Sequence, residues 1–347
     1  MEKNSILGTL FSTPLFRGKS YNDEKPVIDF ELTGSKYEKN RLSYLVNTIA
    51  NSSDIGRDIL KDAAKLGVKL SFDVQPECLG SFGSGEEDGK GPHISLNPTM
   101  SDNDLIATLT HEARHAQQYL RGNTQKFGEC TPKTEVMLYR AAEADAQTAA
   151  LTTVLDIREK TGNSAPFDTF KERSPHIVKK LPEDIISGKA PFKPSAVLMQ
   201  QMFDGWYDSS VMLFSYETSY IRNPMLYTMS HKEFDKMPYD KEMSSAEIVN
   251  MFCKTPDGSC YWKNRPNVLE DTPKTIIDVT TLNVIDEYAK TMKRKTGKEM
   301  NPSYKSLAID CYGRIYESVN EYRESKKQLN AKKQLNPIFA LKAAKTR

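Results

Sequence analysis

Long apolar runs are missing from this chain of 347 residues. A helix that crosses a bilayer needs about 20 consecutive apolar residues, and no stretch of the chain approaches that length. The apolar stretch at residues 6–11 is too short and too weakly flanked for a secretory signal peptide. We therefore expect no membrane span, and a protein that is cytoplasmic or exported without a cleavable signal peptide.

A strong net charge is also lacking, because 48 basic residues oppose 46 acidic ones and leave a formal net charge of +2. Such a balance gives no bulk positive field to attract nucleic acid, so we expect no nucleic-acid partner. Basic side chains do gather in the C-terminal tail, residues 331–347, which we expect to be solvated.

Cysteine is scarce, with five residues and no Cys-x-x-Cys pair. An odd number without paired spacing is typical of free thiols in a reducing compartment. Cys253 and Cys260 flank a turn and would be able to pair in an exported protein, but we do not expect that disulfide.

Residues 111–115 read His-Glu-Ala-Arg-His, which is the strongest functional signal in the chain. On a helix, His111 and His115 lie one turn apart on the same face, so both imidazoles can bind one metal ion. The intervening Glu112 is the residue type that takes a proton from a metal-bound water. The pattern predicts a zinc site with one ion per chain and Glu112 as general base.

The flanking residues predict a helix around this motif. Ser101 is a good N-cap with Asp104 three residues later, and Gly122 is a plausible terminator, so the helix should cover about residues 102–121. Apolar residues at helical spacing place both histidines at the edge of its buried stripe. We expect Arg114 to be a surface or helix-packing charge.

Zinc in a catalytic site needs a third protein ligand, and Glu143 is the best candidate. It lies on a second predicted helix that begins with Thr131 as N-cap and Pro132 at its first position, and that ends at Gly162. Glu135 and Asp145 remain alternative ligands.

The order of elements before the motif is a strand at 68–74, a Gly-rich connection at 80–85, a strand at 93–97 and then the motif helix. This order resembles the zincin metallopeptidases, and a glutamate from a second helix as third ligand resembles their gluzincin branch. The Glu-Ala-Asp at 143–145 is closer to small regulator-type bacterial metallopeptidases and to uncharacterised bacterial metallopeptidase domains. The resemblance covers roughly residues 65–160.

The resemblance implies an α+β zincin-like fold, in which a small twisted sheet packs on the motif helix and on the helix that bears Glu143. It also implies a protein or peptide substrate that aligns along an edge strand, for which 93–97 is our candidate. An oxyanion donor is still needed. His231 is our first choice, and the other candidates are His176, Tyr216, Tyr220 and Tyr227.

We predict four parts of the chain. Residues 1–25 are irregular, 26–162 form the zincin-like domain, 163–330 form a mainly helical region that packs on or beside the active site, and 331–347 form the tail. Two helices at 35–50 and 55–66 should precede the first strand. Helical patterns follow at 168–181, 195–221, 244–254, 275–295 and 302–333. A methionine and aromatic stripe between residues 199 and 220 is expected to be mostly core.

The function favoured by these observations is a zinc-dependent metallopeptidase with a restricted protein substrate. The alternative is a catalytically inactive metal-binding protein, or a helical protein-interaction protein, that acts as a regulator or effector. Glu112 favours the first interpretation, because a purely structural zinc site does not need a base.

Overall fold

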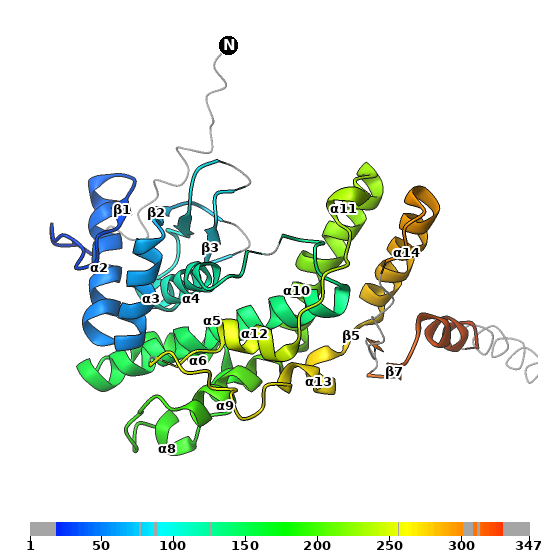
Figure 1. Cartoon of the computed structure of the whole chain (residues 1–347). Helices are drawn as coiled ribbons and strands as arrows, with labels where there is room; N and C mark the ends of the chain where they lie inside the picture. Colours follow the sequence, from blue (N-terminus) through cyan, green and yellow to red (C-terminus); the bar gives the residue numbers. More distant parts are fainter. Residues whose placement is uncertain are drawn as a thin grey trace, which may run out of the picture.

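A computed structural model describes residues 19–75, 78–86, 89–124, 126–255, 257–300, 308–310 and 313–328. The fold is mixed α+β and mostly helical, with two small sheets (Figure 1). The strands are β1 (Glu31–Leu32), β2 (Lys69–Phe72), β3 (Gly80–Gly83), β4 (His93–Leu96), β5 (Ile277–Asp278), β6 (Ala308–Ile309) and β7 (Ile315–Tyr316). The longer helices are α2 (Lys36–Ser52), α3 (Asp54–Lys65), α4 (Asp102–Leu120), α5 (Pro132–Thr161), α6 (Ala165–Arg173), α9 (Ala196–Trp206), α10 (Ser210–Glu217), α11 (Asn223–His231), α12 (Ser245–Phe252) and α14 (Val279–Thr296). Short helical turns are α7 (Pro175–Val178), α8 (Glu183–Ile186), η1 (Thr218–Arg222), η2 (Phe234–Lys236), η3 (Val268–Glu270) and α13 (Thr272–Thr275).

The two central helices begin and end where the sequence predicts. In α4, the Ser101 side chain accepts from the Asp104 amide while the Asp104 carboxylate accepts from the Ser101 amide, which forms a capping box. Thr131 caps α5, and Gly162 ends it in the left-handed region at φ 72°, where glycine carries no steric penalty.

The larger sheet has the order β1-β2-β4-β3, with β3 antiparallel to β4 and the other pairs parallel. The expectation that residues 93–97 form the edge is therefore wrong, because β4 lies between β2 and β3. The free edge on this side belongs to β3, the Gly-rich stretch that the sequence suggests as a connection. Pairing of Phe82 with Ile94 gives this stretch its strand register.

Helix α5 contributes to two hydrophobic clusters. The larger cluster combines the sheet and α2–α5 with α6, α9 and α12, so it runs across the boundary that we predict at residue 162. The smaller cluster lies around α11 and α14 and reaches α5 through Val136. The division into domains itself stays a prediction.

The second half is mainly helical, but four of its predicted helices differ in detail. The pattern at 168–181 is interrupted at Ser174 between α6 and α7, and the pattern at 275–295 contains β5 before α14. The pattern at 195–221 is interrupted after α9, where Ser209 caps a new helix, and it continues into the π-helical turn η1. The pattern at 302–333 contains β6 and β7, which form a small sheet with β5, before a helix at 319–328. Helical spacing of apolar residues cannot exclude such short strands. The predicted tail, residues 331–347, and residues 1–18 lie outside the described residues.

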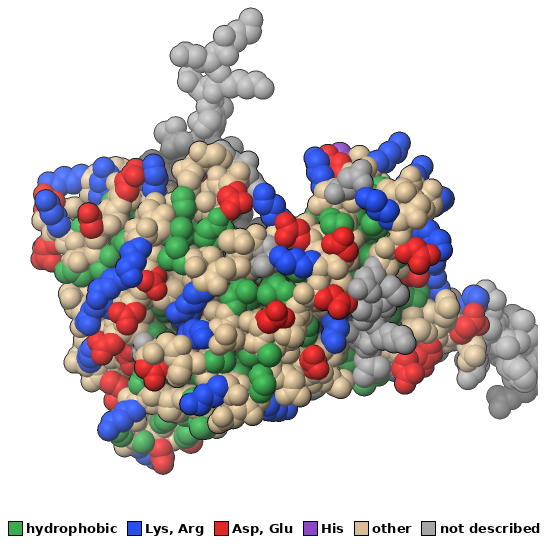
Figure 2. Space-filling model, in the orientation of Figure 1, with side chains coloured by type: hydrophobic (Ala, Val, Ile, Leu, Met, Phe, Trp, Pro, Cys, Tyr) green, Lys and Arg blue, Asp and Glu red, His purple; other side chains and the backbone are tan. Residues whose placement is uncertain are grey.

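No helix among the described residues is long and apolar enough to span a bilayer. The face in Figure 2 carries acidic and basic side chains interspersed rather than a field of one sign. The cysteines at 78, 130, 253 and 260 are free thiols.

Candidate metal centre

The two motif histidines meet on one face of α4. The Nε2 atoms of His111 and His115 lie 3.1 Å apart, and the rings are nearly perpendicular, with centroids 4.7 Å apart. This is the one-turn spacing that the motif predicts. His111 is buried and His115 is partly buried, so both rings lie at the edge of the core as expected.

Glu143 on α5 faces both imidazoles. Its Oε2 lies 3.2 Å from His111 Nε2, and its Oε1 lies 3.4 Å from His115 Nε2. Burial raises the pKa of this carboxyl, but the positive charge of the two neighbouring histidines outweighs that effect and holds the pKa well below its usual range. Glu143 is therefore a carboxylate, the form that binds metal. Among the described residues, His111, His115 and Glu143 form a group whose ligand atoms lie close enough together to hold a metal ion.

The alternative third ligands are engaged elsewhere. Asp145 pairs with Arg114, and Glu135 accepts from the amides of Gly128 and Cys130. The structure brings only Glu143 of the three to the histidines.

The arrangement fits a bound metal ion. Two ligand atoms at about 2.0–2.1 Å from a tetrahedral zinc lie roughly 3.3–3.4 Å apart, close to the 3.1 Å between the two Nε2 atoms and to the 3.2 and 3.4 Å between each of them and the nearer oxygen of Glu143. In addition, Glu143 Oε2 is buried without a hydrogen-bond partner in the described part of the chain. A buried carboxylate oxygen in that state, opposite two imidazole nitrogens, is best explained by a cation between them.

A buried network sets the tautomer of His115. The Gln118 side-chain amide donates to the Ala142 carbonyl and to Asp145, at 2.9 Å each, so its oxygen is left to accept. That oxygen lies 2.9 Å from His115 Nδ1. The proton is thereby held on Nδ1, and the Nε2 lone pair faces Glu143, as a metal ligand requires. Without a cation, burial lowers the pKa of His115 but the Glu143 carboxylate raises it further, to about 9.

Arg114 belongs to the core rather than to the surface. Its side chain is 2% exposed and makes two bonds to Asp145, of 2.7 and 3.0 Å. It also donates to the Phe252 carbonyl, and the Tyr261 hydroxyl donates to Asp145. The pair joins α4, α5 and α12. The surface alternative is wrong, because α4 is buried on nearly every side.

Glu112 is placed to act as a base. Burial raises its pKa, and the neighbouring Glu143 carboxylate raises it further, while the two histidines and the Phe82 amide of β3 lower it. The net pKa stays above the usual value for glutamate, which strengthens the carboxylate as a proton acceptor. The side chain lines the pocket beside His111.

Two tyrosines cover the centre from the opposite wall. The Tyr220 hydroxyl lies 3.4 Å from Glu143 Oε1, and the Tyr216 hydroxyl also interacts with Glu143. Burial and the negative charge of Glu143 raise both phenol pKa values, so both remain proton donors. The two rings stack on each other at 5.5 Å.

Tyr216 lies at the end of α10, and the π-helical turn that follows contains Tyr220. Tyr220 lies within η1, a type of turn that is rare and often found at functional sites. The adjoining Glu217 is bound by Arg140 of α5 at 2.5 Å and accepts from the Asp278 amide at 3.0 Å. This buried ion pair fixes the wall to the helix that carries Glu143.

The structure does not bring His231 to the centre. His231 is exposed at the end of α11, with its ring stacked on Tyr227 at 3.9 Å. His176 lies on α7 and is absent from the residues that line the pocket. Tyr216 and Tyr220 are thus the members of the predicted donor set that reach the metal centre.

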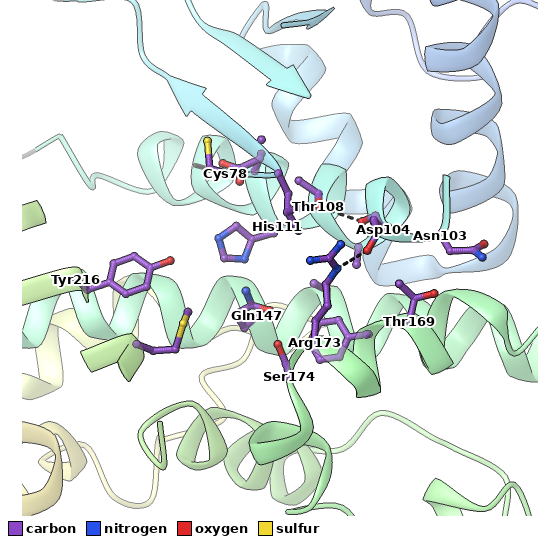
Figure 3. Close-up of a pocket in the computed structure, with 17 residues that line it drawn as sticks. Cys78, Asn103, Asp104, Thr108, His111, Gln147, Thr169, Arg173, Ser174 and Tyr216 are labelled. Atoms are coloured by element: carbon purple, nitrogen blue, oxygen red, sulfur yellow. Dashed lines mark hydrogen bonds and ion pairs between the residues drawn. The ribbon is translucent and has the colours of Figure 1, made fainter. Parts of the chain in front are cut away.

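A pocket of about 310 Å³ opens beside His111 and Glu112 (Figure 3). Its walls come from α4, α5, α6, α10 and the start of β3. The predicted methionine and aromatic stripe divides here: Met199, Met202, Phe203 and Trp206 are core, whereas Met212 and Tyr216 line the pocket.

The sequence predicts the three residues that converge here and Glu112 beside them, but it does not predict the side chains that support them. No sequence pattern marks Arg114, Gln118 or Arg173 as residues of the site. The one available signal is that α4 has apolar or small residues on several faces, which indicates a helix buried all round and therefore a paired Arg114.

A protein-family model described as "Putative metallopeptidase family (DUF6782)" matches residues 33–262. The match covers strands β2, β3 and β4, the motif helix, α5 and the covering wall. Neither the curated proteins nor the solved structures include a match to the chain.

Proposed function

Because the chain belongs to the putative metallopeptidase family DUF6782, we propose that it is a zinc-dependent peptidase that acts on a restricted protein substrate. The observation that carries the proposal is the convergence of His111, His115 and Glu143 beside the buried base Glu112 at the wall of a pocket. A scaffold that only stores metal has no use for that fourth side chain.

A zinc ion bound by these three residues would polarise the scissile carbonyl and make water acidic enough to lose a proton near neutral pH. Glu112 takes that proton as the water oxygen attacks the carbonyl carbon. The same carboxyl group then delivers the proton to the leaving amine as the C–N bond breaks. Its raised pKa suits both steps.

Tyr216 is our candidate for the oxyanion donor. The carbonyl oxygen gains negative charge during the attack and needs a hydrogen-bond donor. Tyr216 lines the pocket with His111 and Glu112, and its raised pKa keeps the hydroxyl proton in place. Tyr220 lies behind it, against Glu143, and is better placed to hold that ligand.

The edge strand β3 is our candidate for the element that aligns the substrate. Leu79 and Gly80 at its start line the pocket. An extended peptide laid along this edge would pair with backbone groups and pass Glu112. We therefore propose a zincin-like fold for the catalytic part of the chain. In it, β3 is the edge strand that aligns the substrate, a role that the sequence analysis gives to residues 93–97.

The test compares cells that express the wild-type chain with cells that express Glu112→Gln, and maps new protein N-termini by labelling and mass spectrometry. We expect new termini only with the wild-type chain, because the amide cannot accept the proton. Zinc content should be equal in the two proteins. Cleavage retained by Glu112→Gln would contradict the role of this residue.

A further inference from the structure

The pocket beside the metal centre has a cation at its far end. Arg173 of α6 is the one Lys or Arg among the described residues that line it. We propose that Arg173 binds a carboxylate of the substrate, so that the substrate class is a peptide with a negative charge on one side of the scissile bond. This inference rests on the proposed peptidase function.

The two partners of the Arg173–Asp104 ion pair differ in their remaining hydrogen-bonding capacity, and this difference favours binding of an anion. Asp104 is buried, and its two oxygens are occupied, one by Ser101 in the capping box and one by Arg173 Nε. Arg173 is about half exposed, at 48% of its side chain. Within the described part of the chain, its remaining nitrogens meet only the Met100 sulfur, at 3.7 Å. Both oxygens of Asp104 therefore already accept hydrogen bonds, while the terminal nitrogens of Arg173 can still donate to another acceptor.

Asp104 also holds the guanidinium in position. The carboxylate is fixed by the helix cap, so it anchors Arg173 through Nε and leaves the two terminal nitrogens for another carboxylate. Figure 3 shows Arg173 reaching from α6 to Asp104, with His111 and Tyr216 at the other end of the pocket.

The spacing suits a substrate residue next to the cleaved bond. Asp104 and His111 are seven residues apart on α4, which corresponds to about 10 Å along the helix axis. A glutamate side chain, or the terminal carboxylate one or two residues beyond the scissile bond, bridges a gap of this order. Phe170 and Met212 line the pocket and would contact its methylenes, while Thr169 and Ser174 add hydroxyl groups.

Matched zinc-binding probes test this directly. We would measure binding of linear monohydroxamates to the zinc-loaded full chain, with spacers from about two to about eight methylenes and a far end that is either a carboxylate or its neutral amide. At the best spacer we expect the carboxylate to bind about tenfold tighter or more than the amide, in line with hydrogen bonds to charged groups.

Arg173→Gln should remove that preference and leave the affinity of the amide probe unchanged. Lys171→Gln is the matched control, since it removes one exposed charge from the same helix outside the pocket. Equal binding of the two probes at every spacer by the wild-type chain would overturn the inference while leaving the peptidase proposal intact. Failure of both probes together with failure to bind zinc would instead overturn the proposed function.

Two peptide pairs identify the source of the carboxylate by competition with the best probe, on zinc-loaded Glu112→Gln protein. One pair differs in a terminal carboxylate or amide, and the other in an internal glutamate or glutamine. A difference in either pair supports the inference and names the source. No difference in both pairs contradicts it.

Discussion

Each side of the pocket rests on a buried ion pair, Arg114 with Asp145 on one side and Arg140 with Glu217 on the other, but the two sides differ in the helices that form them and in the side chains that they present. The ligand side, formed by α4 and α5, rests on the ion pair of Arg114 with Asp145, whose side chains are 2% and 0% exposed. The covering side, formed by α6, α10 and η1, presents Tyr216, Tyr220 and the half-exposed Arg173 from shorter helices.

We infer from this difference that the two sides serve different functions. Buried ion pairs and hydrogen bonds between α4 and α5 support the spacing of His111, His115 and Glu143, on which metal affinity would depend. Under the proposed function, the covering side would contact the substrate and the carbonyl oxygen on which negative charge develops. Changes on the first side should therefore alter stability and metal binding, whereas changes on the second side should alter turnover and selectivity.

Asp145→Ala should show the largest effect. It leaves Arg114 buried without its partner, and the loss of such a partner destabilises a protein by about 3–5 kcal/mol. It also frees Gln118 and hence His115, so zinc should bind more weakly. Denaturant unfolding of the metal-free protein measures the first effect.

Asp286→Ala is the control, because Asp286 pairs with Lys290 at the surface, where a lost ion pair changes stability by about 0–1 kcal/mol. A loss below about 1 kcal/mol for Asp145→Ala would show that the ligand side does not depend on the pair.

Tyr216→Phe should separate the two sides. Removal of one oxyanion donor typically lowers kcat about 10²- to 10³-fold. Zinc content and the free energy of unfolding should stay close to those of the wild-type chain, since the ring and its stacking remain. Steady-state kinetics on a substrate found by mapping N-termini gives the result. An unchanged kcat would move the donor role to Tyr220 or to another group.

Glu135→Gln tests a pH dependence that belongs to the ligand side. Burial raises the pKa of Glu135 from 4.5 to about 8. Between these values the folded protein holds a proton that the unfolded chain releases, so the free energy of unfolding should fall as pH rises from 4.5 to 8. The slope is at most about 1.4 kcal/mol per pH unit.

The glutamine variant keeps an acceptor for the Gly128 and Cys130 amides and should flatten this slope. Unfolding curves at a series of pH values compare the two proteins. The same slope in both would assign the pH dependence to another group.

His231→Ala should have the smallest effect. The ring is exposed and contacts Tyr227 and Ser230, so we expect zinc content, kcat and stability to remain within error of the wild-type values. A substantial loss of activity would restore this histidine as a candidate donor and would require α11 to move toward the centre.

The ligand side was largely predictable from the sequence, and the covering side was not. Local rules act on α4 and α5, because Ser101, Thr131 and Gly162 set their ends and the four-residue spacing sets the two histidines. The choice of Glu143 follows from the need of zinc for a third ligand and from the position of a second helix after the motif helix. The positions of Tyr216 and Arg173 depend instead on contacts between segments more than sixty residues apart, which no local pattern encodes.

The wrong prediction of the edge strand, β4 in place of β3, has a similar cause. A four-residue strand that begins and ends with glycine carries little strand propensity, so its pairing with β4 decides its structure. The sequence therefore predicts a strand at 93–97 correctly and still misplaces the edge.

The most direct test of the account is the metal content of protein purified without added metal, measured by mass spectrometry for the wild-type chain, Glu143→Ala and Glu112→Gln. The account predicts close to one zinc per chain in the wild-type protein and in Glu112→Gln, with a sharp fall in Glu143→Ala. Equal zinc in all three, or no zinc in the wild-type chain even after zinc is supplied, would contradict the assignment of His111, His115 and Glu143 as the ligands.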